Sequence, residues 1–558
     1  MYIYVCVCVK CKYYSYFTGY CFFCQKLFPI ELQLYASKNS MLRLKKLIKI
    51  VLLGGVSGGT FYLTCGNDLD LTSFGVVRFG RAALAAVCIA VDYKLLFSKY
   101  DKSHPEYSHA LHQVHLKSSL RLRNMCCKNG GVFIKVGQHL GSLDYLLPEE
   151  YVQTMKVLHN QAPQSDLTLL KQVIEEDLGR KVEDIFVEFD PIPLGAASLA
   201  QVHKAKLANG QVVAVKIQHP KVKARSYVDI KTMEFLVHAL GWVFPDFNYI
   251  WLAEETKKNL PVELDFLNEG MNCERIGKIL SPFKFLKVPA IYWNLSSDRV
   301  LTMEFCEGGK VDNVQYMKEH NISVNQITER LGQLYSQMIF VEGYVHCDPH
   351  PGNVLVHPTD SGPQIILLDH GLYQTLTDDF RMHYSKMWLA MINADVEGMK
   401  THATALNVGD LFGLFACMLT ARSWKSLTEG IDKKKLTPEE NMQIKESVSK
   451  YLMDISTILN RVPRQMLLLL KTNDVLRGIE QSLKSHPGSA SFMNMSRCCI
   501  KAVTDWELNL CHSWHCYIRI KLYQKIQLAR LSLYSVYLWF TSSTLATLTR
   551  KYWSPAVS

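Results

Sequence analysis

The spacing of the hydrophobic residues divides this chain into helical and extended stretches. Between residues 107 and 178 apolar side chains recur three and four positions apart, which predicts helices that each bury one face. Strand patterns begin at Phe186, and helical periodicity returns at Ser226. From Val324 onward the pattern is again mostly helical. The sequence therefore predicts a strand-rich middle that is flanked by helical regions.

One β-hairpin can be placed closely. Val202–Lys206 and Val212–Ile217 have the character of paired strands, and Asn209-Gly210 lies between them. Because Asn-Gly favours the positive φ angles of a two-residue hairpin turn, we expect that turn here. A further strand pair is expected around Arg299–Phe305, and a strand–loop–strand unit at Tyr344–Tyr373.

Composition and charge restrict the class of protein. Of 558 residues, 48% are hydrophobic and 20% are charged, which is ordinary for a folded protein and excludes wholesale disorder. The net charge of +11 lies at the ends, because residues 1–66 hold eight Lys or Arg against Glu31, and residues 486–558 hold eight against two acidic residues. A nucleic-acid-binding domain normally carries its basic surface on the folded part. We therefore expect no nucleic acid partner, and ends that suit targeting or anionic lipid.

The 17 cysteines are scattered and do not resemble a disulfide framework, which indicates a reducing compartment or buried thiols. One group near the start has the spacing of a four-thiolate zinc site; it consists of Cys8, Cys11, Cys21 and Cys24. Its surroundings are rich in Tyr, Phe and Val and lack the polar turn residues of a zinc knuckle. For residues 1–40 we favour an extension without fixed structure over a zinc site.

A second possible start lies at Met41. Four basic residues between Arg43 and Lys49 precede an uncharged run, Ile50–Cys65, and the next acidic residue is Asp68. The run is shorter than the ~20 residues of a comfortable membrane span. Such a segment can be a mitochondrial presequence, a signal anchor or a secretory signal, and the cysteine content argues against secretion. We interpret residues 41–66 as a mitochondrial targeting or anchor segment, and expect a mitochondrial protein associated with the inner membrane.

The basic C-terminal tail, residues 486–558, contains a second membrane candidate. Leu531–Thr549 holds 19 residues without charge between Arg530 and Arg550. It includes Tyr and Trp side chains of the kind found at membrane interfaces, and eight Ser or Thr residues that disfavour a spanning helix. We expect an interfacial or partner-docking helix, with a spanning helix and an ordinary packed helix as the alternatives.

Three short motifs carry the candidate chemistry. Lys216 lies near the end of the hairpin in Ala-Val-Lys-Ile, where by itself it would be read as a solvated strand lysine. Asp348 precedes Asn353 by five residues, which is the spacing of a kinase catalytic loop in which the Asp accepts a hydroxyl proton and the Asn holds a metal. Asp369 ends an apolar strand ahead of Gly371, where it can chelate Mg²⁺ on nucleotide phosphates. Their order and spacing predict a kinase-like domain with ATP and Mg²⁺ as cofactors.

Together with three further motifs, these residues resemble the aarF/UbiB family of atypical protein-kinase-like proteins over about Lys117–Leu483. Lys135-Val136-Gly137-Gln138 matches the family's K-x-G-Q motif, and Glu263-Leu264-Asp265 matches its E-x-D motif. Pro193–His203 matches its alanine-rich nucleotide loop, with Gly195 in place of the first alanine.

The resemblance implies an α+β, protein-kinase-like two-lobed fold. We expect a helical N-terminal extension over residues 67–185, an antiparallel β N-lobe over 186–305 and a helical C-lobe over 306–485. The expected catalytic residues are Asp348, Asn353 and Asp369, of which the last two hold the metal. The expected ATP-binding residues are Leu194, Gly195, Ala196, Ala197, Ser198, Leu199, Ala200, Gln201, Val202, Lys216 and Glu269.

Four residues are expected to be regulatory, namely Lys135, Gln138, Glu263 and Asp265. The resemblance implies that the K-x-G-Q segment lies across the position where a protein substrate would dock, with Lys135 near the two carboxylates of E-x-D. Alanine restricts the backbone more than glycine, so the Ala-rich loop should be stiffer than a Gly-rich one and hold phosphates differently. Asp369-His370-Gly371 departs from the usual D-F-G, which puts the ordinary switch of that segment in doubt but not metal binding.

Two glutamates compete as the partner of Lys216. Kinase spacing selects Glu234, about twenty residues further on, whereas the family motif selects Glu269 after a longer helical insertion. We favour Glu269, because Glu234 has apolar neighbours on a helix and fits a surface or capping charge better.

Three classes of function remain open. The first is an active Mg²⁺·ATP-dependent kinase or ATPase, which the resemblance directs toward a lipid or small molecule rather than general protein phosphorylation. The second is a nucleotide-binding pseudokinase that signals to a partner, and the third is a scaffold that organises mitochondrial membranes. We favour the first class because all the catalytic side chains are present. The expected partners are a nucleotide, membrane lipid and mitochondrial membrane proteins.

Overall fold

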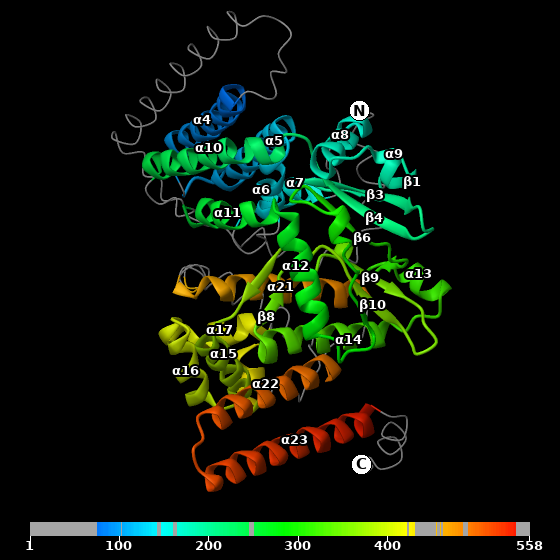
Figure 1. The fold of residues 1–558 in the computed structure, drawn as a ribbon. Helices are drawn as coiled ribbons and strands as arrows, with labels where there is room; N and C mark the ends of the chain where they lie inside the picture. Colours follow the sequence, from blue (N-terminus) through cyan, green and yellow to red (C-terminus); the bar gives the residue numbers. More distant parts are fainter. Residues whose placement is uncertain are drawn as a thin grey trace, which may run out of the picture. The chain divides into compact units, whose positions relative to one another are not determined.

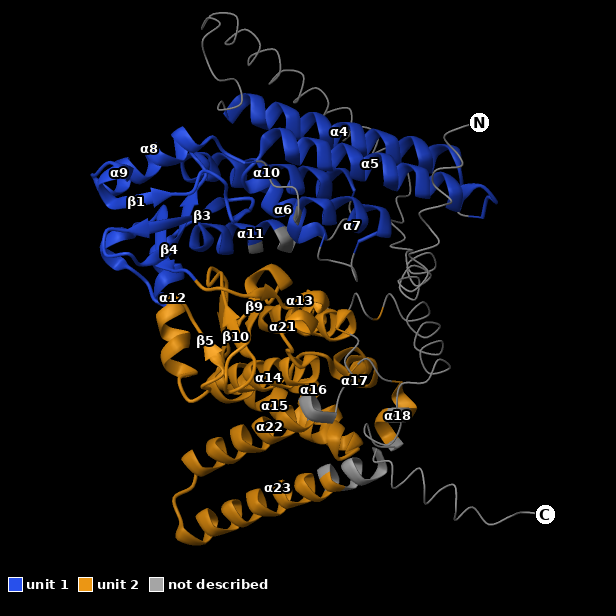
Figure 2. Ribbon diagram, turned by 90° about the vertical axis from the view of Figure 1, so that its right-hand side faces the viewer, with its two compact units in different colours: residues 1–271, 290–305 blue, residues 272–289, 306–558 orange. Residues whose placement is uncertain are grey.

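The computed structural model describes most of the chain, and the described residues are 75–101, 103–141, 147–159, 164–244, 250–420, 423–429, 454, 458, 461–483 and 489–542. The expectations for residues 1–40 and 41–66, including the four-cysteine group, lie outside these ranges, and so does the end of the tail beyond residue 542. The chain forms two compact units (Figure 2), unit 1 with residues 1–271 and 290–305 and unit 2 with residues 272–289 and 306–558.

A group of helices from before and after the first four strands forms one part of unit 1 (Figure 1). They are α4 (Gly75–Lys99), α5 (Tyr107–Asn129), α6 (Val132–Gly141), α7 (Glu149–Lys156), α10 (Val222–Val243) and α11 (Ile250–Glu263). Ala82 and Ala83 of α4 pack in one core with Phe133 and Ile134 of α6. The short alanine side chains allow the helices to approach closely. A buried ion pair also joins α4 to α10, since the Arg78 guanidinium donates to Asp229 at 2.8 Å.

The sheet of unit 1 is antiparallel. It contains β1 (Phe186–Phe189), β2 (Gly195–Ala196), β3 (Ala200–Leu207), β4 (Val212–Gln218) and β6 (Val300–Glu304), in the order β1-β3-β4-β6 with β2 beside β3. Helices α8 (Leu167–Leu178) and α9 (Val182–Ile185) contribute to the core on one face, where they meet Val213, Val215 and Ile217 of β4. Side chains alternate between the faces of a strand, so Lys216 is directed to the other face.

The connection between β3 and β4 corrects one expectation. The strands pair as predicted, from Ala200↔Gln218 to Lys206↔Val212, but the register extends to a hydrogen bond from Leu207 N to Gln211 O. The loop therefore has three residues rather than a two-residue turn. Gly210 has φ +86°, whereas Asn209 does not adopt a positive φ. The Asn209 carboxamide instead accepts a hydrogen bond from Gln211 N, which stabilises the longer loop.

Unit 2 holds short strands among helices. The strands are β5 (Leu286–Lys287), β7 (Gly309–Lys310), β8 (Tyr344–His346), β9 (Val354–His357), β10 (Gln364–Leu367) and β11 (Tyr373–Thr375). β9 and β10 pair antiparallel, as do β8 and β11, so in the expected strand–loop–strand unit the inner pair is nested within the outer pair. This nesting places the ends of β8 and β10 in the same part of the unit.

Unit 2 is mostly helical, and all of the following helices except the first lie in the stretch expected to be helical from Val324 onward. They are α13 (Val314–Glu319), α14 (Val324–Ser336), η5 (Gln337–Glu342), α15 (Asp378–Ile392), α16 (Val396–Ala405), α17 (Phe412–Thr420), α18 (Trp424–Glu429), α21 (Arg464–Ser482), α22 (Ser489–Asn509) and α23 (Trp514–Ser542). Helix α12 (Phe266–Ile279) begins in unit 1 and ends in unit 2. The mostly antiparallel strands and the majority of helices confirm the predicted α+β, kinase-like fold class. Within the described ranges, no helix is long and apolar enough to cross a bilayer.

Candidate active site

Lys216 and Glu269 form the central ion pair of unit 1. The Lys216 ammonium lies 2.7 and 2.8 Å from the two carboxylate oxygens of Glu269, and it also lies over the ring of Phe266. Lys216 points from β4 toward α12, whose first turn carries Glu269. Both side chains are largely buried, with 12% of the lysine and 4% of the glutamate exposed. Their charges therefore act in surroundings of low dielectric, where a charge-assisted pair is strong.

Glu234, the competing candidate, has other partners. It lies on α10 and pairs with Lys231 at 2.9 Å and Lys257 at 2.8 Å. These two ammonium groups lower the pKa of Glu234 to about 2. The structure therefore confirms that Lys216 pairs with Glu269, and it places Glu234 in a surface charge cluster.

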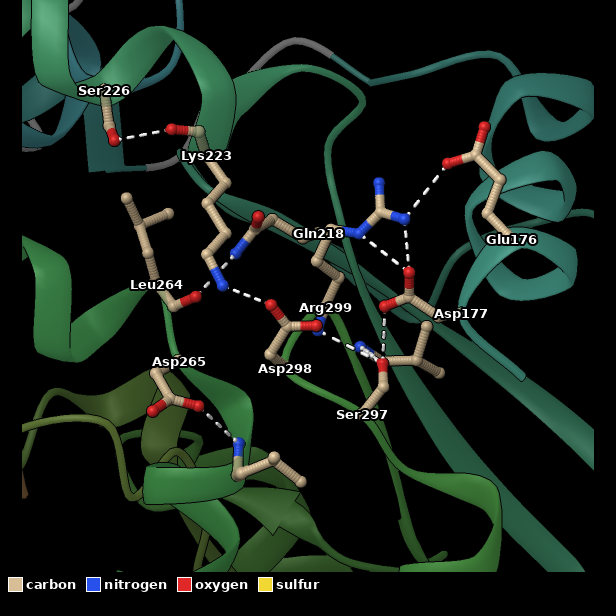
Figure 3. A network of polar contacts seen from close by, with 12 residues as sticks. Glu176, Asp177, Gln218, Lys223, Ser226, Leu264, Asp265, Ser297, Asp298 and Arg299 are labelled. Atoms are coloured by element: carbon tan, nitrogen blue, oxygen red, sulfur yellow. Dashed lines mark hydrogen bonds and ion pairs between the residues drawn. The ribbon is translucent and has the colours of Figure 1, made fainter. Parts of the chain in front are cut away.

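The E-x-D segment is fixed by a polar network around the end of β4 (Figure 3). Gln218 donates to the carbonyl of Leu264 at 3.2 Å. Phe266 N also donates to the carbonyl of Asp298 at 3.1 Å. The Asp265 carboxylate accepts a hydrogen bond from Leu267 N, so it caps the helix that carries Glu269. The motif thus ties the start of α12 to the strand that carries Lys216.

The same network extends to the far side of the sheet. Arg299 donates to Asp177 of α8 at 2.9 Å, and Lys223 pairs with Asp298. Asp298 thus holds α10 through its side chain and α12 through its carbonyl. These contacts position the ion pair of Lys216 without taking part in it.

The K-x-G-Q segment on α6 contacts both neighbouring motifs. Lys135 forms an ion pair of 2.5 Å with Glu263, which is 8% exposed. Gln138 accepts a hydrogen bond from Ser198 of the Ala-rich loop and donates one to the Leu158 carbonyl. A side chain at Gly137 would meet Leu158 at 2.4 Å, which explains the small residue in the motif. Lys135 is therefore close to E-x-D as expected, through Glu263.

The Ala-rich loop is a tight hairpin between β2 and β3. Gly195 is opposite Val202 and Ala196 is opposite Gln201. The imidazole of His219 is hydrogen bonded to the Ala197 carbonyl at 2.9 Å. Ala196 and Ala197 are partly exposed or exposed, whereas the residues from Ser198 to Gln201 are buried. Strand pairing and the His219 contact constrain the backbone of this loop, and its stiffness relative to a Gly-rich loop stays a prediction.

The residues of the predicted catalytic loop in unit 2 are held by hydrogen bonds to backbone groups. Asn353 donates from Nδ2 to the Asp348 carbonyl at 3.1 Å, and its own carbonyl accepts from Leu368 N at 2.8 Å. Asp348 and Asn353 are both half-buried. Directly before Asp348, Cys347 is fully buried, and burial raises the pKa of its thiol to about 12. A thiol with so high a pKa stays protonated near neutral pH, so the predicted base of this loop remains the Asp348 carboxylate and the predicted metal ligand the Asn353 amide.

His346 joins the two motifs of unit 2. Its Nδ1 lies 3.3 Å from Asp348 N, and its Nε2 lies 3.0 Å from the Asp369 carbonyl. Because Asp348 N can only donate, Nδ1 accepts and Nε2 donates. Sequence reasoning gave no role to this histidine, although its place two residues before Asp348 is a signal that could have found it. The imidazole fixes the catalytic loop and the Asp369 turn together.

Asp369 has an unusual backbone conformation. Its φ of 51° lies in the left-handed region, which is uncommon for residues other than glycine. Its carboxylate accepts from Gly371 N at 3.3 Å. Such strain persists where the surroundings fix it, and it is frequent at functional sites. The His346 contact supplies part of that constraint.

His370 occupies the position of the missing phenylalanine and is anchored by polar contacts. It is 3% exposed, and its ring nitrogens contact the Tyr373 hydroxyl at 2.8 Å and the Leu367 carbonyl at 3.1 Å. Its carbonyl accepts from Asn272 of α12 at 3.0 Å. These bonds anchor the Asp369-His370-Gly371 segment at its central residue.

Lys471, a residue that sequence reasoning missed, contacts Asp348. It lies on α21, and its ammonium is 3.5 Å from Oδ1 of Asp348. The neighbouring Leu469 and Thr472 are fully buried, so the helix is firmly packed at this point. No local spacing links Lys471 to the catalytic loop, since the two are far apart in sequence.

The donor set of unit 2 fits a hard cation. Asn353 and Asp369 offer amide and carboxylate oxygens, which are the ligands that Mg²⁺ prefers, and waters and phosphates usually complete its shell. Because Asn353 donates through Nδ2, its Oδ1 remains as the acceptor atom of that amide. Among the described residues no cluster of three or more His, Cys, Asp or Glu could hold a metal by itself. This pair therefore suits a metal that also binds a phosphate-bearing ligand.

Comparison with known proteins gives a consistent match. Residues 157–403 match the ABC1 atypical kinase-like domain. The chain is 52% identical over 503 residues to AarF domain-containing protein kinase 1 of Gallus gallus, a match that covers 90% of this chain and 97% of that protein. It is 54% identical over 446 residues to the Mus musculus protein of the same name, covering 80% and 85%. It is also 50% identical over 440 residues to AarF domain-containing kinase 1 of Drosophila melanogaster, covering 78% and 85%.

Proposed function

Because this chain belongs to the ABC1/AarF family of atypical kinase-like proteins, we propose that it is a Mg²⁺- and ATP-dependent kinase or ATPase. We place it at the mitochondrial inner membrane, acting on a lipid or small molecule. The observation that carries the proposal is the ion pair of Lys216 and Glu269. In active protein kinases the corresponding pair must be in place for the lysine to hold nucleotide phosphates.

Each motif has a role in this proposal. Lys216 binds the phosphates of ATP, and residues Leu194 to Val202 cover them. Asn353 and Asp369 hold Mg²⁺, which when bound neutralises charge on the phosphates. Asp348 accepts the proton that the acceptor hydroxyl loses as its oxygen bonds to the γ-phosphorus and the bond to ADP breaks. If the acceptor is water, the same proton transfer yields phosphate, which is ATPase activity.

The contacts of α6, the helix that carries the K-x-G-Q motif, favour the interpretation that phosphoryl transfer is restrained in this protein. Lys135 and Gln138 bond to the E-x-D motif and to the Ala-rich loop, so α6 holds both the loop that would cover the nucleotide and the segment that leads into the helix of Glu269. This favours a second candidate function, a nucleotide-binding pseudokinase or scaffold that acts through a partner in membrane organisation. Both candidate functions require nucleotide binding, but only the active kinase or ATPase turns over ATP.

The test measures thermal stabilisation by ATP and ATP turnover in the full chain. Asp369→Asn should abolish the Mg²⁺-dependent part of the stabilisation, which at 100-fold the dissociation constant is about 2.7 kcal/mol. Asp348→Asn is nearly isosteric and should keep that stabilisation while turnover falls by about 10²–10⁴-fold. Asp360→Asn, at an exposed loop position, is the matched control.

The outcomes separate the candidates. An unchanged Mg²⁺·ATP stabilisation in Asp369→Asn would overturn the metal assignment. Turnover in Asp348→Asn as fast as in wild type would show that any activity seen arises elsewhere. Stabilisation by nucleotide without turnover in the wild type would select the pseudokinase.

A further inference from the structure

Helix α23 has two apolar faces, and α22 covers one of them. Ile520 and Leu531 are buried, and Leu531 packs with Met493 and Ile500 of α22. The other face is exposed. We define the exposed stripe of α23 as the apolar residues Trp514, Ile518, Leu522, Ile526, Leu533 and Val536, which are between 45% and 71% exposed.

The stripe is continuous along one side of the helix. At 3.6 residues per turn its six positions fall within about one third of the circumference, and Ile520 and Leu531 fall on the opposite side. Folded proteins rarely expose a large contiguous apolar patch that has no binding role. Sequence reasoning expected an interfacial helix at 531–549, whereas the exposed apolar face begins at Trp514.

Basic side chains border the stripe on both sides. By the same helical geometry Lys521 and Lys525 lie along one edge, and Arg519 and Arg530 along the other. The helix contains no acidic residue, and the sequence has none after Glu507. Helix α23 therefore presents apolar side chains between two rows of positive charge.

We propose that α23 lies along an anionic membrane surface. The exposed stripe of α23 inserts among the acyl chains just below the headgroups, and the four basic side chains contact lipid phosphates. This arrangement matches the layered chemistry of a bilayer surface, and the aromatic Trp514 suits its interface. The inference deepens the proposed membrane association but does not depend on phosphoryl transfer.

Charge argues against the alternative occupant, a second copy of the chain. Two copies that meet through this face would use the same patch twice. Their rows of Lys and Arg would then face each other without a carboxylate on the helix to neutralise them. Anionic lipid removes that repulsion, because the negative charge comes from the surface itself.

The test is flotation of the full chain with vesicles of phosphatidylcholine, alone or mixed with phosphatidylglycerol. The wild type should float with the mixed vesicles, and less so as salt increases. Lys521→Gln with Lys525→Gln should weaken this binding by about 30-fold, at about 1 kcal/mol for each charge. Ile518→Gln, Leu522→Gln and Ile526→Gln together should remove it.

Two exposed apolar residues of unit 1 provide the control, because Leu169→Gln with Val187→Gln should leave flotation unchanged. Flotation of the triple variant like wild type would overturn the inference. The inference would also be overturned if the wild type did not bind vesicles and instead formed a dimer that the triple variant did not form. ATP turnover measured without vesicles should be the same in the triple variant and in the wild type. A wild type that shows no ATP turnover would therefore count against the proposed function and not against membrane binding by α23.

A second inference rests on a separate contact and on the proposed function. The catalytic loop from His346 to Asn353 contains no Lys or Arg, so it has no permanent positive charge beside its carboxylate. Lys471 supplies one from α21, at 3.5 Å from Oδ1 of Asp348. We infer that Lys471 is a positioning residue, which directs the Asp348 carboxylate toward the acceptor hydroxyl.

Steady-state kinetics of the full chain test this role. Lys471→Met should lower kcat by about 100-fold, because a misplaced base loses its alignment, while KM for ATP stays unchanged. Lys471→Arg should restore part of kcat. Lys400→Met, at an exposed position of α16, is the control. The partly exposed pair contributes little to stability, so the melting temperature should not change.

Two outcomes would contradict the inference. One is a wild-type kcat in Lys471→Met, and the other is an equal loss in the Met and Arg variants accompanied by a lower melting temperature. The second would indicate a structural role. Absence of turnover in the wild type itself would instead remove the proposed function, and this inference with it.

Discussion

Lys216 and Glu269 lie in contact within unit 1, although 53 residues separate them in the sequence. The lysine comes from a strand and the glutamate from the first turn of α12. Asp265 caps that helix, and Gln218 holds the preceding segment. The ion pair therefore depends on a scaffold in which the E-x-D motif takes part.

Glu269→Gln should weaken both the fold of unit 1 and nucleotide binding. It leaves the Lys216 ammonium largely buried without its charge partner, which for a broken buried pair costs about 3 kcal/mol. Glu234→Gln should change neither, because Glu234 sits in the surface charge cluster. Thermal melting with and without ATP measures both effects. Equal behaviour of the two variants would contradict the assignment.

Lys135→Met should have opposite effects on stability and on activity. The buried Glu263 loses its partner, so the melting temperature should fall. The release of α6 should raise autophosphorylation or alter nucleotide preference. Lys135→Met combined with Glu263→Leu should recover stability while it keeps the altered activity. If the double variant behaves like wild type in turnover, Lys135 does not restrain the site.

Gly195→Ala restores the residue found in the family's loop and should be tolerated. A Cβ at Gly195 meets nothing within 4 Å, and its φ is not positive. Reduced freedom of the unfolded chain should stabilise the protein by about 0.4–1 kcal/mol. Gly210→Ala is the contrast, since φ +86° there strains any other residue and should lower stability. Urea unfolding of both variants provides the comparison.

His115 should make unit 1 sensitive to acid. Burial is the main cause that lowers the pKa of His115 to about 4, followed by the charge of His112. Its Nδ1 lies 2.5 Å from the Tyr93 hydroxyl. Below pH 6.5 the unfolded chain binds a proton that the folded form does not, so stability falls as the pH drops from about 6.5 to 4. The loss approaches about 3 kcal/mol.

His115→Gln should remove this dependence, whereas His109→Gln, at an exposed site of the same helix, should retain it. Urea unfolding at a series of pH values provides the measurement. The prediction would be contradicted if the free energy of unfolding changed with pH in the same way for the wild type and for His115→Gln between about pH 6.5 and 4.

A chain that begins at Met41 should reach mitochondria as the full chain does. The basic and apolar run over residues 41–66 carries the targeting pattern. Fluorescence microscopy of tagged versions checks this. A cytosolic Met41 form beside a mitochondrial full chain would instead assign a role to residues 1–40.

The sequence by itself determined what depends on local spacing. Hydrophobic periodicity and turn chemistry depend on residues that are close in the sequence. They were therefore enough to predict the interval from Asp348 to Asn353, the strand before Asp369 and the paired strands around Gly210. Even there the turn length was wrong, since Asn209 bonded to Gln211 and left only Gly210 in the left-handed region.

Only the tertiary structure decided which distant side chains meet. Glu234 and Glu269 both lie on helices, and packing of α12 against the sheet selected Glu269. The approach of Lys471 to Asp348 likewise has no local signal. Helix α23 is apolar on both faces, so its sequence could not tell the covered face from the open one. The type of a residue determines whether its side chain is more stable in apolar, polar or oppositely charged surroundings. Which distant residue provides those surroundings is decided by the fold.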